Sequence, residues 1–375
     1  MDIILLTLSL ISGQLFKLSI GTQGGLTILD IAIIIFCIWG SIGLKFKLQK
    51  PPLWIKSGFA FIAVALISLL LTPLSLTFTE YFTALSYAIR FSLYIFFGWL
   101  IYSGAFNFVK KNVDKILFFS GSALAFLGLT QFFFLPDLSF LIKYGWDPHF
   151  SRAASTFFDP NFLGCFLVLS LITLTKLKRT KIFYVLFTFL YITLLVTFSR
   201  GAYLAFLSGF LAYSILNKSL RWGIVTIFLF MALMLGFTSY QTEVAQPRNI
   251  DRTMSAQARL DTWQQGIALF QLHPILGVGF NAYRYGIREY NLGDEQFLAS
   301  HGSTTNDSSL LYVASTAGFI GLISYLFFLG TLIKQKNPLL TAGLFALLAQ
   351  SFFANTLFYP HLLIWVILIS VVHKK

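Results

Sequence analysis

Apolar runs of roughly 17 to 25 residues recur along the whole chain, and this repetition constrains the fold more than any other feature. A run of that length crosses the hydrocarbon core of a bilayer as one helix, which bonds its own backbone polar groups. Charged residues make up only 11% of the chain, against about 25% in soluble globular proteins. The sequence therefore predicts an integral membrane protein built from helices.

The predicted fold class is an all-α polytopic membrane protein with about twelve transmembrane helices. The predicted spans are 3–20, 26–44, 57–77, 83–103, 116–135, 161–175, 182–198, 201–216, 222–238, 308–333, 338–355 and 358–372. No internal repeat or linker divides the chain, so residues 1–375 are expected to form one membrane domain. Residues 239–307 form a long hydrophilic insertion before the last three spans.

Lysine and arginine alternate between the predicted loops, and this alternation sets the orientation, because cytoplasmic loops retain these residues. The basic loops contain Lys45, Lys47, Lys50 and Lys56; Lys110, Lys111 and Lys115; Lys176, Lys178, Arg179 and Lys181; Lys218 and Arg221; and Lys334 and Lys336. Both termini are thus expected to be cytoplasmic and the insertion 239–307 to be outside. The net charge of +13 arises mainly from the Lys and Arg residues of the predicted cytoplasmic loops. It therefore does not indicate a nucleic-acid partner.

The insertion 239–307 contains the pattern of an amphipathic helix. Apolar residues recur at three- and four-residue spacing and share one face: Ala256, Leu260, Trp263, Ile267 and Phe270. Polar residues occupy the other side: Gln257, Asp261, Gln264 and Gln265. The helix is expected to lie against the outer membrane surface and to end before Pro274. Arg259, on its apolar flank, either anchors the helix among lipid headgroups or binds a substrate anion.

Two further arginines stand where a membrane makes a charge costly. Arg200 follows Ser199 in an outer turn with almost no other polar residue, and Arg90 lies inside the predicted span 83–103. Arg200 is either a turn anchor or part of an outward pocket, because a guanidinium grips phosphate oxygens in a planar, bidentate manner. Arg90 is either functional or paired with Asp30, which enters the membrane from the same face.

Two polar clusters precede later spans. Asp159-Pro160-Asn161 is expected to start a helix, with Asp159 as its cap and Pro160 in the first position, in preference to catalysis by Asp159. The run HGSTTND, from His301 to Asp307, supplies an imidazole and a carboxylate, either of which can take a proton from a hydroxyl nucleophile. A capped, solvated loop is the alternative interpretation of this run, and the favoured one for His301.

Three segments and one short motif resemble the O-antigen ligase and O-antigen polymerase superfamily of polytopic glycan transferases. The segments are TFSRGAYLA (197–205), ARLDTWQQGIALFQLHPILGVGFNAY (258–283) and TNDSSLLYVASTAGFIGL (305–322), and the motif is DPN (159–161). Their order and spacing carry the resemblance, and a long outer loop before the last few spans agrees with it. The resemblance implies a GT-C-like helical architecture.

The resemblance also implies an activity, which is the inverting transfer of an undecaprenyl-diphosphate-linked oligosaccharide to a hydroxyl of an acceptor glycan or glycolipid, without metal or cofactor. It implies that Arg200 and Arg259 clamp the diphosphate, whose developing negative charge guanidinium groups stabilise at a poorly hydrated site. The further substrate-binding candidates are Arg90, Ser199, Asn161 and Trp263. The implied location is a bacterial cytoplasmic membrane, with the active site facing outward.

One departure from the family concerns the catalytic base. Ligases of this family typically carry a His-Asn pair just before the late span, and the corresponding places here are Asp307 and Ser308. Asp307 is therefore preferred as the base, because burial can raise the pKa of a carboxyl toward a useful range. His301 is the second candidate. The change favours a polymerase or another glycan ligase over a lipid A-core ligase.

Two other classes fit part of this pattern. A transporter or flippase for a lipid-linked glycan would also use an arginine-lined cavity, although internal repeats and a midplane site are more typical of transporters. A peptidoglycan-polymerase-type glycosyltransferase shares the many spans and the lipid-linked donor. The segments ARLDTW and HPILGVGF favour the O-antigen ligase and polymerase superfamily over these two classes.

Overall fold

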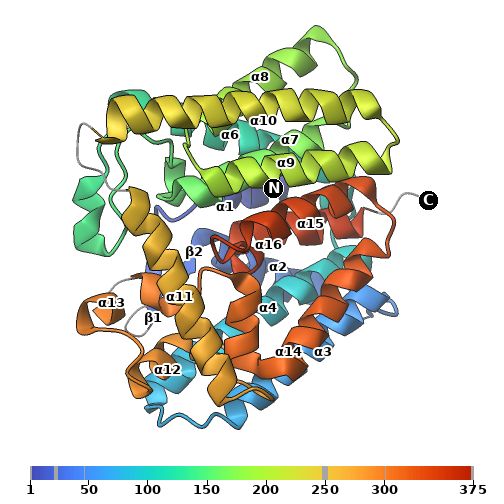
Figure 1. Ribbon diagram of the computed structural model, residues 1–375. Helices are drawn as coiled ribbons and strands as arrows, with labels where there is room; N and C mark the ends of the chain where they lie inside the picture. The colour runs from blue at the N-terminus through green and yellow to red at the C-terminus, as the bar shows by residue number, and fades with distance from the viewer. Residues whose placement is uncertain (1, 21–23, 46, 247–251, 300, 373–375) are drawn as a thin grey trace.

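The computed structural model describes residues 2–20, 24–45, 47–246, 252–299 and 301–372. Most of the regular structure is helical (Figure 1). The apolar helices are α1 (Asp2–Ser12), α2 (Ile28–Gly43), α3 (Leu53–Leu70), α4 (Phe78–Tyr102), α6 (Val113–Phe134), α7 (Pro160–Leu174), α8 (Lys181–Leu195), α9 (Arg200–Leu216), α10 (Leu220–Tyr240), α14 (Ser309–Ile333), α15 (Pro338–Gln350) and α16 (Pro360–Val371). The other elements are β1 (Lys17–Ile20), β2 (Gly24–Thr27), α5 (Asn107–Lys111), η1 (Ser139–Tyr144), η2 (Ser155–Phe157), η3 (Gln241–Ala245), α11 (Arg252–Leu272), α12 (Tyr283–Glu289), α13 (Glu295–Ala299), η5 (His301–Thr304) and η6 (Thr356–Phe358).

Five helical stretches within the described residues are long and apolar enough to cross a membrane: α3, α4, α6, α10 with its continuation to Ala245, and Gly302–Ile333, which contains α14. Shorter apolar helices accompany them, namely α1, α2, α7, α8, α9, α15 and α16. Each predicted span overlaps one of these helices. The chain is therefore an all-α polytopic membrane protein, and the number of twelve crossings stays a prediction.

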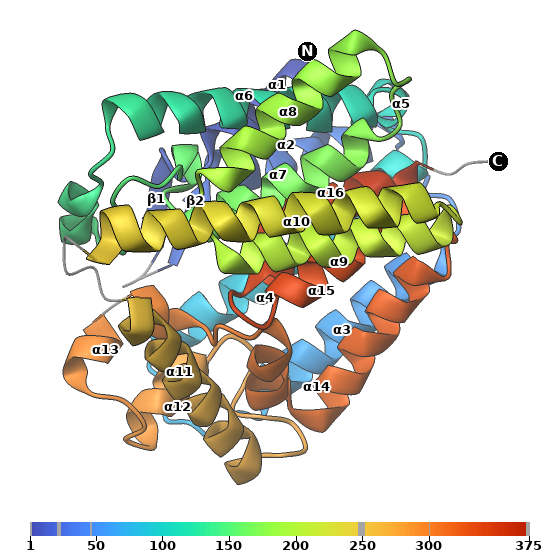
Figure 2. The ribbon, with the colours of Figure 1, turned by 45° about the horizontal axis from the view of Figure 1, so that its top comes forward.

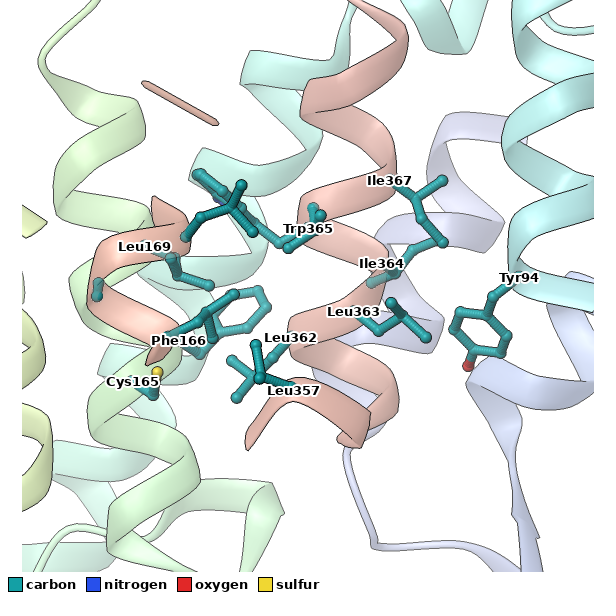
Figure 3. Packing of buried hydrophobic residues seen from close by; sticks show 14 of the residues in the cluster. Tyr94, Cys165, Phe166, Leu169, Leu357, Leu362, Leu363, Ile364, Trp365 and Ile367 are labelled. Atoms are coloured by element: carbon teal, nitrogen blue, oxygen red, sulfur yellow. The ribbon is translucent and has the colours of Figure 1, made fainter. Parts of the chain in front are cut away.

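Helix α16 lies at the centre of the bundle, in contact with α4, α7 and α15. Every residue from Pro360 to Val371 is buried, as expected for a helix that is apolar on all faces. Figure 3 shows Trp365 on the side of α7 and Leu363 facing Tyr94 of α4. Around this centre α9 packs between α10 and α15, and α14 runs along α3 (Figures 1 and 2).

The predicted span 3–20 is wrong beyond Ser12. Gly13 has a left-handed backbone (φ 55°) and follows the end of α1. The chain then forms the antiparallel hairpin β1–β2, in which Lys17 pairs with Thr27. The side chain of Thr27 then caps α2 by accepting from the backbone N–H of Asp30. A hairpin therefore replaces the second half of the predicted helix, and it carries Lys17 out of the apolar segment.

The insertion 239–307 folds onto one end of the bundle (Figure 1). The predicted amphipathic helix is present as α11, which ends at Leu272, two residues before Pro274. Its protein-facing side differs from the predicted stripe. The buried residues Thr262, Gly266 and Leu269 face the bundle, whereas Leu260 and Ile267 are 50% and 43% exposed.

Contact of the exposed stripe with the membrane surface stays a prediction. Gln265 was predicted on the polar side of the helix, facing solvent. This was wrong, because its amide donates to the carbonyl of Leu292 at 2.9 Å.

Helix α14 is broken at Gly318, where φ is 66° and ψ is −167°. The segment 274–279, from the run HPILGVGF, fills this break. The N–H of Phe319 donates to the carbonyl of Pro274 at 2.8 Å, and the N–H of Val278 donates to that of Ser315 at 3.0 Å. Non-helical backbone at membrane depth is tolerated only where protein re-satisfies its polar groups. Here the insertion satisfies them.

Helix α3 secures the same junction. The hydroxyl of Ser68 donates to the carbonyl of Leu276 at 2.6 Å and to that of Thr316 at 2.7 Å. One turn later Thr72 donates to the carbonyl of Val278 at 2.5 Å. The insertion is thereby attached to two membrane helices at once.

Substitution of Gly318 by alanine is expected to destabilise the protein by about 2 kcal/mol or more, because a Cβ there meets the Ile275 carbonyl in a backbone conformation that favours glycine. Gly330→Ala, in the same helix with no atom within 4 Å of the added Cβ, is the matched control. Thermal unfolding in detergent should show a lower Tm for Gly318→Ala only. Equal Tm values for the two variants would contradict the role of the break.

Candidate active site

A cavity of about 1020 Å³ opens where the hairpin, the start of α9 and the insertion meet. Small-molecule sites are typically about 300–1,000 Å³, so this one is at the upper end of the range. The cavity brings together predicted site residues from distant parts of the chain: Arg90, Asn161, Ser199, Arg200, Arg259 and Asp307. Whether these residues bind substrate stays a prediction.

Arg200 is held at the cavity wall by the start of α9. Ser199 caps this helix, accepting from the backbone N–H of Ala202 at 3.3 Å. Its hydroxyl also donates to the side-chain carbonyl of Asn161 at 2.7 Å. The guanidinium of Arg200 lies 5.3 Å from the ring centroid of Phe237. The predicted outer turn is thus a helix start, fixed by the DPN motif.

Arg259 and Asp307 are linked through Thr262. The hydroxyl of Thr262 lies 2.9 Å from the carbonyl oxygen of Arg259 and 3.3 Å from a carboxylate oxygen of Asp307, and donates to both. The positive charge of Arg259 also acts on the Asp307 carboxyl. One side chain on α11 therefore ties the candidate clamp to the candidate base.

A buried amide completes this link and was missed by the sequence analysis. Asn306 is fully buried, and its amide nitrogen donates to the hydroxyl of Tyr283 at 3.0 Å and to the carbonyl of Thr262. Its amide oxygen accepts from the N–H of Ser308 at 2.8 Å. Asn306 lies next to Asp307 in the run HGSTTND. This position was the sequence signal that could have identified it as a site residue. Buried amides with satisfied groups fix a local geometry, and here they fix the loop that carries Asp307.

Arg200 and Arg259 come close enough for their positive charges to interact. Among the described residues neither of them forms an ion pair within 4.0 Å. Like charges on one cavity wall repel unless solvent or an anion lies between them. Guanidinium pairs of this kind suit the bidentate binding of phosphate oxygens.

The carboxyl of Asp307 has a strongly shifted pKa. Asp307 lies in the loop before α14, outside that helix. Burial raises the pKa of its carboxyl to about 6, while Arg259 and the hydrogen bond from Thr262 act in the opposite direction. A carboxylate with this pKa is ionised at neutral pH and is a better proton acceptor than an ordinary aspartate.

The structure confirms one of the two sequence interpretations of Arg90, the pair with Asp30, and a functional role stays a prediction. Its Nε lies 3.0 Å from a carboxylate oxygen of Asp30, which is 3% exposed, so the predicted pair is present. Tyr94 also donates to Asp30, at 3.1 Å, and the Arg90 guanidinium lies 4.7 Å from the ring centroid of Tyr87. Arg90 nevertheless lines the cavity. It is a paired cation at the cavity wall.

Three other residues have simpler positions. Asp159 caps α7 and accepts from the N–H of Asn161 at 2.6 Å, which confirms the cap interpretation. Trp263 lies outside the cavity lining and donates to the carbonyl of Phe352 at 3.1 Å. Residue His301 belongs to η5, but its side chain lies outside the described part of the structure.

Arg152 was also missed as a site residue. Its side chain is 5% exposed and lines the cavity. Its Nε donates to the carbonyl of Thr197 at 2.9 Å, and Nη2 donates to that of Phe198 at 3.3 Å. These carbonyls lie in the turn before Ser199, so Arg152 positions the start of α9. Its position between the predicted spans 116–135 and 161–175, in a loop predicted to be outside, was the available sequence signal.

The fold and the cavity define a class, a polytopic membrane protein with an arginine-lined cavity at one end of its helix bundle. Residues 182–326 of the chain match the family described as O-Antigen ligase. This segment runs from α8 to beyond the break in α14. The predicted resemblance to the O-antigen ligase and polymerase superfamily is thereby confirmed for this segment, which contains Arg200, Arg259 and Asp307. A search of curated proteins finds no match for the chain.

Arg90→Ala is expected to lower the free energy of unfolding by about 3 kcal/mol, because it leaves the buried carboxylate of Asp30 without its partner. The double variant Asp30→Asn, Arg90→Gln removes both charges and should recover at least half of that loss. Denaturation in detergent measures both values. If Arg90→Ala is as stable as the double variant, the pair is not a stabilising contact.

Proposed function

We propose that the protein transfers a glycan from a polyprenyl-diphosphate carrier to a sugar hydroxyl of an acceptor glycan or glycolipid at the outer face of the cytoplasmic membrane. The family match supports glycan ligation in a broad sense. The donor, the inverting course and the metal-independent mechanism belong to the proposal. Transport of the lipid-linked glycan is the alternative that the first experiment below distinguishes, and peptidoglycan-type polymerisation is the second alternative.

One observation carries the proposal: Arg200 on α9, Arg259 on α11 and Asp307 before α14 line the same cavity. The two guanidinium groups match the diphosphate of the donor, and the carboxyl supplies a proton acceptor nearby. Aromatic residues make up about a third of the cavity lining, and they suit sugars, whose apolar faces pack on rings while their hydroxyls form hydrogen bonds.

In the proposed reaction the acceptor hydroxyl loses its proton to Asp307, and its oxygen attacks the anomeric carbon of the donor sugar. The bond between that carbon and the phosphate oxygen breaks, and the electron pair leaves with the polyprenyl diphosphate. Arg200 and Arg259 stabilise the charge that develops on this leaving group. Attack from the opposite face inverts the anomeric configuration. Asp307 then releases its proton to water.

The directions of the helices support an outward-facing cavity. Helices α2, α9 and α14 begin next to cavity-lining residues. Their opposite ends lead to Lys45, Lys218 and Lys334, which belong to the loops rich in Lys and Arg. Such loops are retained in the cytoplasm.

The double variant Arg200→Ala, Arg259→Ala is expected to reduce transfer by at least about 100-fold, since each guanidinium contributes to leaving-group stabilisation. Cells that depend on this variant should accumulate undecaprenyl-diphosphate repeat units on the outer leaflet, measured by lipid extraction and sidedness labelling. Arg221→Ala, an exposed arginine outside the cavity lining, is the control. Accumulation on the inner leaflet would instead indicate a transporter, and unchanged glycan would refute the clamp.

The rate of transfer should rise with pH through about 6, because Asp307 acts only when ionised and burial raises the pKa of its carboxyl to about 6. Thr262→Val removes a hydrogen bond that lowers this pKa, so the midpoint should move to higher pH. Thr226→Val, which loses only a bond to Trp222 within α10, should keep the original midpoint. The pH range from 5 to 7 covers about one unit on either side of this pKa. A transfer rate that does not change over this range excludes Asp307 as the base.

A further inference from the structure

The cavity carries a second cationic pair, formed by Lys17 and Arg90. Lys17 comes from strand β1 and lines the cavity, with its ammonium 5.9 Å from the ring centroid of Trp146. Among the described residues it forms no ion pair within 4.0 Å. The charge of Arg90 acts on Lys17, while that of Arg259 acts on Arg200. Four cations of the described lining thus interact in two pairs, and a fifth, Arg152, is bound to the carbonyls of Thr197 and Phe198.

The hairpin is shaped to place Lys17 in the cavity. Its aliphatic stem lies over Gly25 on the opposite strand, so closely that a Cβ at Gly25 meets three carbon atoms of the Lys17 side chain. The carbonyl of Gly25 accepts a hydrogen bond from Arg90. A glycine therefore allows the lysine stem, the strand and the arginine to lie together.

The environment of Lys17 favours an anionic ligand. Burial lowers the pKa of its ammonium, and the positive charge of Arg90 lowers it further. A negative ligand offsets both effects. Asp30 already pairs with Arg90, so Lys17 is the cation of this pair that remains available to a ligand.

We propose that Lys17, supported by Arg90, forms a second anion subsite that binds a carboxylate or phosphate carried by a sugar of the glycan substrate, separate from the diphosphate site at Arg200 and Arg259. This inference rests on the proposed function, because it assumes that the cavity holds a glycan. The large cavity volume leaves room for sugar units beyond the diphosphate. The subsite makes the enzyme selective for acidic glycans.

The test measures binding to the full chain in nanodiscs of uncharged lipid, with four probes: inorganic pyrophosphate, trigalacturonate, glucose 6-phosphate and the neutral trisaccharide maltotriose. Lys17→Ala should weaken binding of trigalacturonate, glucose 6-phosphate or both by about tenfold or more, as expected for loss of a charge-assisted contact. It should leave pyrophosphate binding within about twofold. The two acidic probes show whether the subsite prefers a carboxylate or a phosphate.

Gly25→Ala tests the geometry without changing any charge. It should displace the Lys17 stem and reproduce the loss seen in Lys17→Ala, whereas Gly43→Ala, with no atom within 4 Å of the added Cβ, should bind all probes normally. Lys17→Arg should retain binding of the acidic probe. Thermal unfolding of each variant checks that the fold is intact.

The inference is overturned if the acidic probes bind no better than maltotriose. It is also overturned if Lys17→Ala weakens pyrophosphate as much as the acidic sugar, since Lys17 would then belong to the diphosphate site. Failure of the proposed function has a different signature, because pyrophosphate binding would then be insensitive to Arg200→Ala and Arg259→Ala.

Discussion

The hydrocarbon core of a membrane offers no water to backbone polar groups, and every other feature of this structure depends on how they are satisfied. Helices satisfy them over most of the chain. At Gly318 the ladder of α14 is interrupted, and the segment 274–279 supplies the missing partners. Ser68 of α3 and Thr72, two residues beyond the end of that helix, bond the same segment. The insertion is therefore hydrogen-bonded into the bundle at this junction.

Features with a local cause could be predicted from the sequence. The apolar helices follow from run length, and the cap at Asp159 follows from its neighbours Pro160 and Asn161. The pair between Arg90 and Asp30 was one of two interpretations, because a charge inside a membrane segment needs a partner. The family motifs named Arg200 and Arg259, Asp307 was preferred at the place where the sequence departs from the family's His-Asn pair, and all three line one cavity.

Features that depend on distant pairing could not be predicted. The contact between Gly318 and Ile275 joins residues that carry no complementary pattern. Arg152 bonds carbonyl oxygens of Thr197 and Phe198, and a backbone carbonyl leaves no mark in the sequence. The protein-facing side of α11 could not be predicted, because its apolar stripe and its packing surface differ, and hydrophobic spacing reports only the stripe.

The two guanidinium groups of the candidate clamp belong to different parts of the framework. The backbone at Arg200 is joined through Ser199 and Asn161 to the start of α7, whereas the backbone at Arg259 is joined through Thr262 to the loop that precedes α14. Their mutual repulsion is offset when a diphosphate lies between them, so an anion favours the approach of α11 to α9. Because Thr262 bonds both the carbonyl of Arg259 and the carboxylate of Asp307, a displacement of α11 is transmitted to Asp307. In the proposed function, the position of the base Asp307 therefore depends on whether the diphosphate is bound.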